Sequence, residues 1–275
     1  MAGDETDYPT GDMMKGRRGV VMGVANKNSI AWAIAQQLKA QGAELAFTYI
    51  EPMEKRVRPL AEELGVTKLI PCDVSSDESM DTAFGEIERD WGGLDFLVHA
   101  IAYADRDQIK GSFVENTTRA GFAQALDISA FSFVDASRRA SEMMKPGGSI
   151  ITLTYLGAER TIPSYNVMGV AKAALEAATR YVARDLGPKG IRVNAISAGA
   201  IKTLSLGGIA GGRSMLSEGR KWAPMREDTD PKGVAGAALY LLSDLGTSCT
   251  GEVLHVDAGF HIVGMPEPDA EDGQD

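Results

Sequence analysis

The 275-residue sequence is poor in cysteine and histidine and has no apolar run close to the roughly 20 residues of a membrane span. Two cysteines, Cys72 and Cys249, are too few for a disulfide scaffold and suit a reducing compartment. They and the three scattered histidines have no metal-ligand spacing, so we expect no metal. The start of the chain lacks the basic and apolar stretches of a secretory signal. These absences predict a cytoplasmic, globular protein with no membrane contact.

A surplus of base is also missing, since 28 Lys and Arg stand against 38 Asp and Glu. Nine of the acids lie in residues 1–14 and 265–275, which contain no base, and the rest of the chain holds 29 acids against 28 bases. A nearly neutral body argues against nucleic acid as a partner. We expect 1–14 and 265–275 to be acidic disordered tails and 15–264 to be one domain.

Between these ends, short apolar runs without polar alternation alternate with longer stretches of helical period. This order predicts an α/β, single-domain, Rossmann-like fold, in which a doubly wound sheet of seven mainly parallel strands has helices on both faces. The expected strands are 18–24, 43–49, 68–72, 94–100, 149–155, 192–197 and 253–256, and the expected helices are 29–40, 53–64, 77–91, 118–144, 165–186 and 231–243. The long, irregular, glycine-rich stretch at about 198–224 is expected to be a substrate lid, with a disordered insertion as the alternative.

Ligands bind such sheets at the carboxyl ends of the strands. The first predicted strand ends at Gly23, where the backbone can approach a ligand closely, and Ser29 is suited to cap the next helix. The N–H groups and the helix dipole there favour a pyrophosphate, although an ordinary turn would use the same residues. Asp73 follows the third strand, where it could accept from an adenine amino group or cap the next helix. His99 lies inside a predicted strand, so a core role is favoured over catalysis.

Two tyrosines and a lysine form the most specific pattern in the chain. Tyr155 ends a predicted strand, whereas Tyr165 and Lys172 are two helical turns apart and share one face of the next helix. A nearby ammonium would lower the pKa of the phenol and help it stabilise an oxyanion. The alternative, two packing tyrosines and an exposed lysine, does not explain why the three converge at the binding edge of the sheet.

These motifs resemble the short-chain dehydrogenase/reductase superfamily and, within it, the enoyl-acyl carrier protein reductases of bacterial fatty acid synthesis. The similarity runs from about Gly16 to Gly264 and includes Gly23 with Ser29-Ile30-Ala31, Cys72-Asp73-Val74, Asp127-Ile-Ser129, Tyr155-Leu-Gly-Ala-Glu-Arg160, Tyr165-Asn-Val-Met-Gly169 and Lys172. The Tyr-x6-Lys spacing is typical of these reductases. Gly169 stands where the Tyr-x3-Lys pattern of most short-chain enzymes would require lysine, which argues against alcohol or ketone reduction.

The resemblance implies that NADH reduces a trans-2-enoyl thioester carried by acyl carrier protein. Tyr155, Tyr165 and Lys172 are the implied catalytic residues, and Ala104, Tyr155 and Tyr165 the implied substrate contacts. Lys172 would also hold the nicotinamide ribose. The other implied cofactor contacts are Gly23, Ser29, Ile30, Asp73, Val74, Ile101, Ile201 and Thr203.

An acid at the end of the second predicted strand, Glu51, favours the free ribose hydroxyls of NADH over the 2′-phosphate of NADPH. Small residues on the two longest predicted helices permit close packing between subunits, and the resemblance implies a homotetramer. Two other functions stay open on the sequence alone: a short-chain alcohol or ketone reductase, and an NADH-binding sensor without catalysis.

Overall fold

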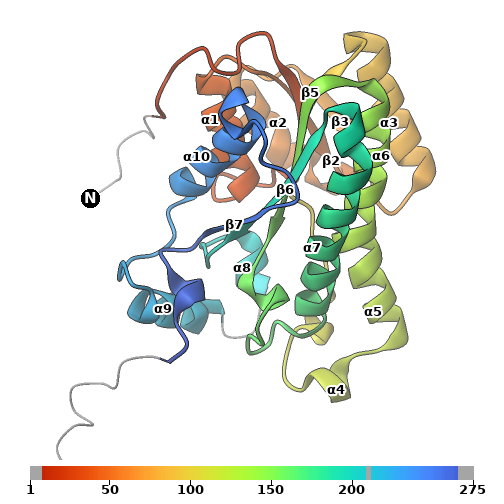
Figure 1. Ribbon diagram of the computed structural model, residues 1–275. Helices are drawn as coiled ribbons and strands as arrows, with labels where there is room; N and C mark the ends of the chain where they lie inside the picture. Colours follow the sequence, from red (N-terminus) through yellow and green to blue (C-terminus); the bar gives the residue numbers. More distant parts are fainter. Residues whose placement is uncertain (1–7, 209–211, 266–275) are drawn as a thin grey trace, which may run out of the picture.

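A computed structural model of the protein describes residues 8–208 and 212–265. Seven strands form a single sheet in the order β3-β2-β1-β4-β5-β6-β7, and every neighbouring pair is parallel (Figure 1). The strands are β1 (Arg18–Met22), β2 (Glu44–Tyr49), β3 (Lys68–Pro71), β4 (Leu94–His99), β5 (Met144–Thr154), β6 (Arg192–Ala198) and β7 (Val253–Val256). The predicted α/β fold with seven parallel strands is therefore confirmed.

The helices follow the predicted alternation with three differences. They are α1 (Ile30–Ala40), α2 (Glu54–Leu64), α3 (Asp77–Trp91), α4 (Phe113–Asn116), α5 (Arg119–Leu126), α6 (Ser132–Met143), α7 (Asn166–Leu186), α8 (Leu204–Gly208), α9 (Gly212–Trp222) and α10 (Pro231–Leu242). A π-helical turn at Asp127–Phe131 divides the helix predicted at 118–144. The short α4 was not predicted, and α8 and α9 occupy much of the stretch that was expected to be irregular.

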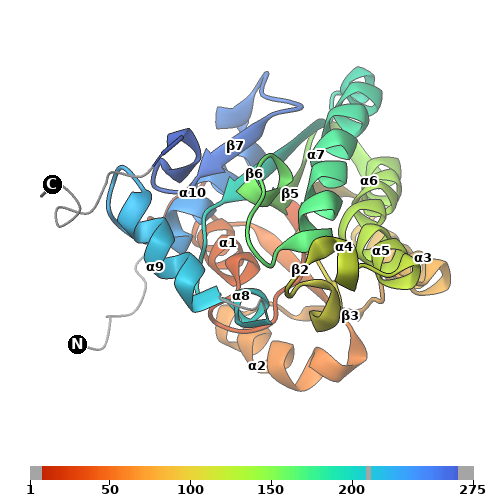
Figure 2. The same cartoon turned by 90° about the horizontal axis from the view of Figure 1, so that it is seen from below.

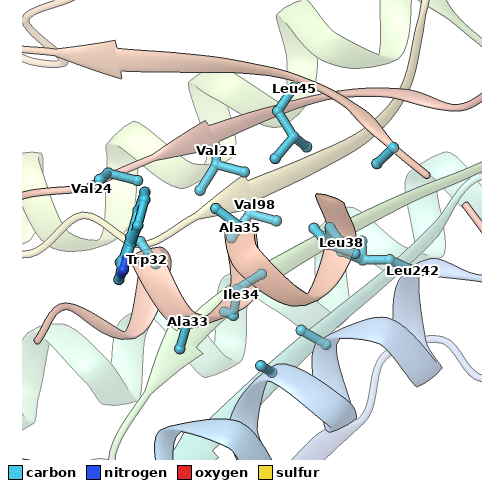
Figure 3. Packing of buried hydrophobic residues seen from close by; sticks show 14 of the residues in the cluster. Val21, Val24, Trp32, Ala33, Ile34, Ala35, Leu38, Leu45, Val98 and Leu242 are labelled. Carbon is cyan, nitrogen blue, oxygen red and sulfur yellow. The ribbon is translucent and has the colours of Figure 1, made fainter. Parts of the chain in front are cut away.

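The sheet is the middle of three layers, with α1, α2 and α10 on one face and α3, α6 and α7 on the other (Figure 2). On the first face, α1 lies between the strands and α10, so it buries residues around most of its circumference (Figure 3). Trp32, Ile34 and Leu38 are among the buried side chains of α1 in this cluster. The second cluster holds Phe133 of α6 and Leu175 of α7 against β1, β4 and β5. Burial on both faces explains why the strand sequences are continuously apolar.

The strand order reverses between β1 and β4, which are neighbours although β2 and β3 lie between them in the chain. A crevice forms at such a reversal because the connections on its two sides run to opposite faces of the sheet, and ligands bind there. Four of the predicted site segments follow β1, β4, β5 and β6, which are consecutive in the sheet. The topology thus brings these segments to one edge.

The folded body begins earlier than the predicted boundary at residue 15. Tyr8 and Met14 are buried in the same cluster as α1. The carbonyl oxygen of Pro9 accepts hydrogen bonds from the side-chain amides of Gln37 (3.2 Å) and Gln41 (2.6 Å). The prediction of a disordered tail is therefore wrong for residues 8–14, because buried apolar side chains outweigh their acidic context. Residues 1–7 and 266–275 of the predicted tails lie outside the described residues. Within the described ranges, no helix has both the length and the apolar character needed to cross a bilayer.

Candidate active site

The turn between β1 and α1 requires glycine at its first position. Gly23 has φ +100°, and a Cβ there would overlap the carbonyl oxygen of Ala100, which follows β4. Ser29 precedes α1 as predicted, yet its side chain makes no cap hydrogen bond to the helix and instead donates to the carbonyl oxygen of Asn26 at 2.7 Å. The predicted side-chain cap is therefore wrong. The hydrogen bond between Ser29 and Asn26 closes the turn, and α1 begins at the next residue, Ile30.

The segment after β4 is fixed by the π-helical turn. The hydroxyl oxygen of Ser129 accepts from the N–H of Tyr103 at 2.9 Å, and Ser129 donates to the carbonyl oxygen of Tyr103 at 3.1 Å. Ile101 and Ala104 lie on either side of this clamp, both partly exposed. A π-helical turn shifts the side chains of a helix by one position and is frequent at functional sites. In this protein the π-helical turn places the Ser129 hydroxyl against the segment that follows β4.

His99 is the core residue that its position in the strand predicted. Its Nε2 lies 2.8 Å from the hydroxyl of Ser132, and its Nδ1 lies 3.1 Å from that of Thr152. Burial, together with the nearby charge of Lys172, lowers the pKa of His99 to about 3. His99 is therefore neutral, and it joins β4, β5 and α6 behind the site.

Tyr165 is placed by a strained turn. Ser164 and Asn166, on either side of it, have positive φ values of 61° and 43°, which are costly for residues other than glycine. The side chain of Asn166 donates to the carbonyl oxygens of Lys110 and Gly111 at 3.2 and 3.3 Å. These bonds stabilise the strained backbone and hold the phenol of Tyr165 at the start of α7.

The two tyrosines are in direct contact. Their ring centroids lie 5.1 Å apart in an edge-to-face arrangement, and both rings pack in one cluster with Ala104. A Cβ on Gly157 would overlap the ring of Tyr165. The structure thus brings together the three residues that were predicted to contact the substrate.

Lys172 lies on α7 with its side chain buried. Its ammonium donates to the carbonyl oxygen of Leu153 in β5 at 2.7 Å. In the next residue of β5, Thr154 donates its hydroxyl hydrogen to Oε1 of Glu176 at 2.7 Å. The end of β5 therefore holds α7 at two points one helical turn apart.

Burial dominates the proton equilibria of these groups. It raises the pKa of Tyr155 to about 12, with a contribution from Asp257, and lowers the pKa of Lys172 to about 8. The pKa of Tyr165 is raised strongly, by burial first and then by Tyr155 and Glu176. The predicted lowering of this phenol's pKa by Lys172 is therefore wrong for the protein alone. Tyr165 is a neutral hydrogen-bond donor at physiological pH.

At the opposite end of the same edge, Asp73 follows β3 and is exposed. Its Oδ1 accepts from the N–H (2.9 Å) and the hydroxyl (2.7 Å) of Ser75. Ser76, whose hydroxyl accepts from the N–H of Ser79, caps α3, so the alternative role of Asp73 as that cap does not apply. Val74 packs with Ile101 at the margin of the second cluster.

The chain after β6 continues into α8 and α9. Ile201 is buried in the first cluster, and the hydroxyl of Thr203 accepts from the N–H of Leu206 at 3.2 Å, which fixes the start of α8. A cavity of about 30 Å³ lies between α9 and the strand ends, lined by Tyr155, Gly199, Ala200, Met215, Leu216, Gly219, Arg220, Glu227, Asp228, Thr229, Asp257 and Phe260. Helix α9 thus reaches Tyr155.

A second cavity of about 280 Å³ lies at the amino ends of β1, β2 and β3, away from these residues. The charged side chains that line it include two ion pairs, Arg18 with Glu44 (2.8 Å) and Lys68 with Asp90 (2.5 Å). Among the described residues, no group of three or more His, Cys, Asp or Glu is arranged to hold a metal ion.

Three features of the site were not predicted from the sequence: the clamp by Ser129, the contact of Gly157 with Tyr165, and the buried carboxylate of Glu176. Only the position of Glu176 could have been predicted from the sequence, since it lies four residues after Lys172 and therefore on the same face of α7. The clamp by Ser129 joins residues 26 apart in the chain, and the contact of Gly157 with Tyr165 depends on how the intervening turn packs.

Comparison with known proteins agrees with this geometry. A curated relative, enoyl-[acyl-carrier-protein] reductase [NADH] 2 of Rhizobium meliloti, is 52% identical over 259 residues, which cover 94% of this chain and 96% of the relative. The crystal structure of the enoyl-acyl carrier protein reductase of Anaplasma phagocytophilum in complex with NAD matches with a TM-score of 0.91 at 50% identity, over 95% of this chain and 100% of that one.

The Bacillus cereus enzyme, solved with NADP+ and an indole naphthyridinone, matches with a TM-score of 0.90 at 49% identity, over 92% of this chain and 100% of that one. The family model described as enoyl-(acyl carrier protein) reductase matches residues 23–261, a range that contains Gly23, Tyr155, Tyr165 and Lys172. The chain therefore belongs to the enoyl-acyl carrier protein reductase family of short-chain dehydrogenases/reductases.

Proposed function

We propose that this protein reduces trans-2-enoyl thioesters of acyl carrier protein to saturated acyl thioesters with NADH, the last step of the bacterial fatty acid elongation cycle. The observation that carries the proposal is the ring contact between the partly buried Tyr155 and the buried Tyr165 at the carboxyl edge of the sheet, with the buried Lys172 two helical turns further along α7. Family membership and the reductases named among its relatives support it.

The residues at this edge fit a dinucleotide. The contact between Gly23 and Ala100 leaves no room for a Cβ, which suits close approach of a pyrophosphate to the start of α1. The exposed Asp73 and the partly buried Val74 suit the adenine end, and Glu51, two residues after the end of β2, suits free ribose hydroxyls. Ser29, Ile30, Ile101, Ile201 and Thr203 complete the proposed cofactor contacts. NADH is accordingly preferred to NADPH.

When it is bound, the cofactor supplies a hydride to the β-carbon of the enoyl group. Charge then develops on the thioester oxygen, and the enolate is protonated at the α-carbon. Tyr165, held neutral by burial, donates a hydrogen bond to that oxygen. Lys172 holds the nicotinamide ribose and adds positive potential. Tyr155 and Ala104 flank the acyl chain, and both pack against Tyr165. Positioning and oxyanion stabilisation together supply most of the rate.

The alternatives are less well supported. A ketone reductase of the Tyr-x3-Lys type requires a lysine at position 169, where a Cβ on Gly169 would already lie 2.7 Å from the carbonyl oxygen of Gly157. A sensor without catalysis has no use for a buried phenol and a buried lysine on one face of a helix. The assay described below gives a different result for each of these two alternatives.

The wider context of the reaction is also part of the proposal. Acyl carrier protein delivers the substrate, and the segment predicted as a lid at 198–224, of which residues 209–211 lie outside the described residues, closes over it with α8 and α9. Exposed apolar side chains on α6 and α7, including Val134, Val170 and Tyr181, suit association into a homotetramer. The free thiols Cys72 and Cys249 suit the cytoplasm.

The test is oxidation of NADH, followed by absorbance, with a crotonyl thioester as substrate. We expect turnover with the thioester, weaker turnover with NADPH and none with simple ketones. Tyr165→Phe should lower kcat by about 10²-fold, the usual effect of losing one oxyanion donor. Turnover of ketones alone would support the alcohol reductase, and tight NADH binding without turnover of any enoyl thioester would support the sensor.

A further inference from the structure

The proposed mechanism uses Lys172 as a cation but leaves a second buried ionisable group on the same helix without a role. Glu176 is one turn after Lys172 on α7, and the two residues are only 7% and 6% exposed. A charge buried to this degree is costly unless another charge or several hydrogen bonds compensate it. Each of the two residues therefore affects the charge of the other.

Their fixed partners come from adjacent residues of one strand. Leu153 accepts from Lys172 and Thr154 donates to Glu176, both at 2.7 Å. The hydroxyl of Thr154 donates a hydrogen bond to the carboxylate of Glu176 but, being neutral, does not compensate its negative charge. Among the described residues, the Lys172 ammonium forms no ion pair with a carboxylate, so the charge of Glu176 acts on it through the buried, low-dielectric interior and not by direct contact.

We propose that Glu176 is a positioning residue for Lys172: its buried carboxylate, held by Thr154, supplies the negative charge that keeps the ammonium in place for the cofactor ribose. This inference rests on the proposed function for the role of Lys172. It assigns to Glu176 no contact with the substrate.

The electrostatics of the neighbouring groups agree. Burial lowers the pKa of Lys172, and Glu176 is the charged group that raises it again. The pKa of Glu176 is itself raised, by burial first and then by Glu159, while the hydrogen bond from Thr154 and the charges of His255 and Arg180 lower it. His99, the other titratable group near the ammonium, is neutral.

The affinity for NADH should depend on pH through both Lys172 and Glu176. Above pH 8 the Lys172 ammonium loses its proton, and affinity for NADH falls. At low pH, protonation of Glu176 removes its charge, and affinity falls again. Without Glu176 the ammonium is less stable, so the alkaline loss begins at lower pH and the acid loss disappears.

The experiment measures the Kd of NADH by fluorescence from pH 5.5 to 9.5, in the full-length wild-type protein and in Glu176→Gln. We expect the alkaline midpoint to move down by about one pH unit in the variant, which is a tenfold loss of affinity at pH values above both midpoints. Glu176→Asp, which keeps the charge, should recover most of this loss. Glu88→Gln on α3 removes the same charge from an exposed position and should leave the profile unchanged.

A second pair of variants tests the hydrogen bond. Thr154→Val removes the hydroxyl and should move the acid limb to higher pH, since a carboxylate without this donor protonates more readily. Thr154→Ser retains the donor and should restore the wild-type limb. Circular dichroism and thermal unfolding of each variant show whether it is folded, and if Glu176→Gln is not, the Asp and Thr154 variants carry the test.

An unchanged alkaline midpoint in folded Glu176→Gln would overturn the inference. A wild-type pH profile in Glu176→Gln together with a shifted profile in Glu176→Asp would also contradict the inference, because the shape of the side chain and not its charge would then matter. The proposed function is tested separately by the wild-type protein, and it fails if that protein does not reduce the crotonyl thioester with NADH.

Discussion

Gly169 in α7 faces the carbonyl oxygen of Gly157, which would lie 2.7 Å from a Cβ at position 169. Gly157 in turn leaves room for the ring of Tyr165, because a Cβ on Gly157 would overlap that ring. These two glycines, one on each side of the turn that leads into α7, thus allow α7 to approach the end of β5 with the phenol close by. The same contact excludes a lysine at position 169 and leaves position 172 as the place for the amine.

We predict that Gly169→Ala lowers both stability and turnover. Alanine in a helix normally stabilises by about 1 kcal/mol relative to glycine, but here the overlap with a backbone oxygen should reverse the sign and cost about 1–3 kcal/mol. Displacement of Gly157 would also move Tyr165, so kcat should fall. Urea unfolding and the crotonyl thioester assay measure the two effects.

Gly236→Ala is the matched control for this substitution. Gly236 lies in α10, and a Cβ there meets no atom within 4 Å. The Gly236→Ala protein should therefore be more stable than wild type by about 0.5–1 kcal/mol and should have an unchanged kcat. If Gly169→Ala behaves in the same way, the close contact has no energetic weight.

The burial of Lys172 predicts that its removal stabilises the protein while it weakens NADH binding. With a pKa of about 8 in the folded state and 10.5 as its ordinary value, the folded chain holds its proton less tightly than the unfolded chain. The destabilisation is complete below pH 8 and disappears as the pH rises to 10.5. At 1.36 kcal/mol per pKa unit, less the lost hydrogen bond to Leu153, Lys172→Met should gain about 2 kcal/mol at pH 7.

Urea unfolding at pH 7 and pH 10 checks this result, since the advantage of Lys172→Met should shrink at the higher pH. The Kd for NADH should rise at pH 7 in the same variant. Lys189→Met, at an exposed position after α7, should change stability by less than about 0.5 kcal/mol at both pH values. A Lys172→Met protein that is less stable than wild type at pH 7 would show that the interactions of the ammonium with Leu153 and Glu176 outweigh the cost of burying its charge.

Much of this architecture could be predicted from the sequence, for reasons that particular residues make clear. The strands are continuous apolar runs, and the spacing of Tyr165 and Lys172 places both on one face of a helix, so local pattern was sufficient. The role of Ser29 was not predictable, because its hydroxyl has two acceptable partners and the carbonyl of Asn26 is the one it uses. The burial of Tyr8 against the α1 cluster and the contact of Gly157 with Tyr165 depend on tertiary packing.

The hydrogen bonds of His99 predict its tautomer. Ser132 donates its hydroxyl hydrogen to the carbonyl oxygen of Ile128 at 2.6 Å, so its oxygen must accept from Nε2–H of His99. The hydroxyl of Thr152 lies 3.1 Å from both Nδ1 and the carbonyl oxygen of His99, and because a neutral ring has a single N–H, which Nε2 carries, Nδ1 is the acceptor in this pair. With a pKa of about 3, His99 should remain neutral in this Nε2–H form throughout pH 5–8.

Nitrogen-15 NMR of histidine-labelled protein distinguishes the forms, because a protonated and an unprotonated ring nitrogen have well-separated shifts. The two nitrogens of His99 should keep these shifts as the pH falls from 8 to 5. Since the unfolded chain takes up a proton near pH 6.5 that folded His99 refuses, this residue should also lower stability progressively below that pH. Titration of the His99 signals near pH 6 would contradict the buried arrangement.

The position of residues 8–14 predicts that the acidic start of the chain is not dispensable as a whole. Tyr8 and Met14 are buried against α1, and Pro9 accepts from Gln37 and Gln41. At about 1.5–3 kcal/mol for each large buried side chain, deletion of residues 1–14 should cost several kcal/mol and lower Tm. Deletion of residues 1–7 alone is the matched control and should leave both Tm and kcat near wild type. Equal Tm values for the two truncated proteins would mean that the contacts of Tyr8 and Pro9 add nothing to stability, and the domain would then begin at residue 15 as its charge pattern suggests.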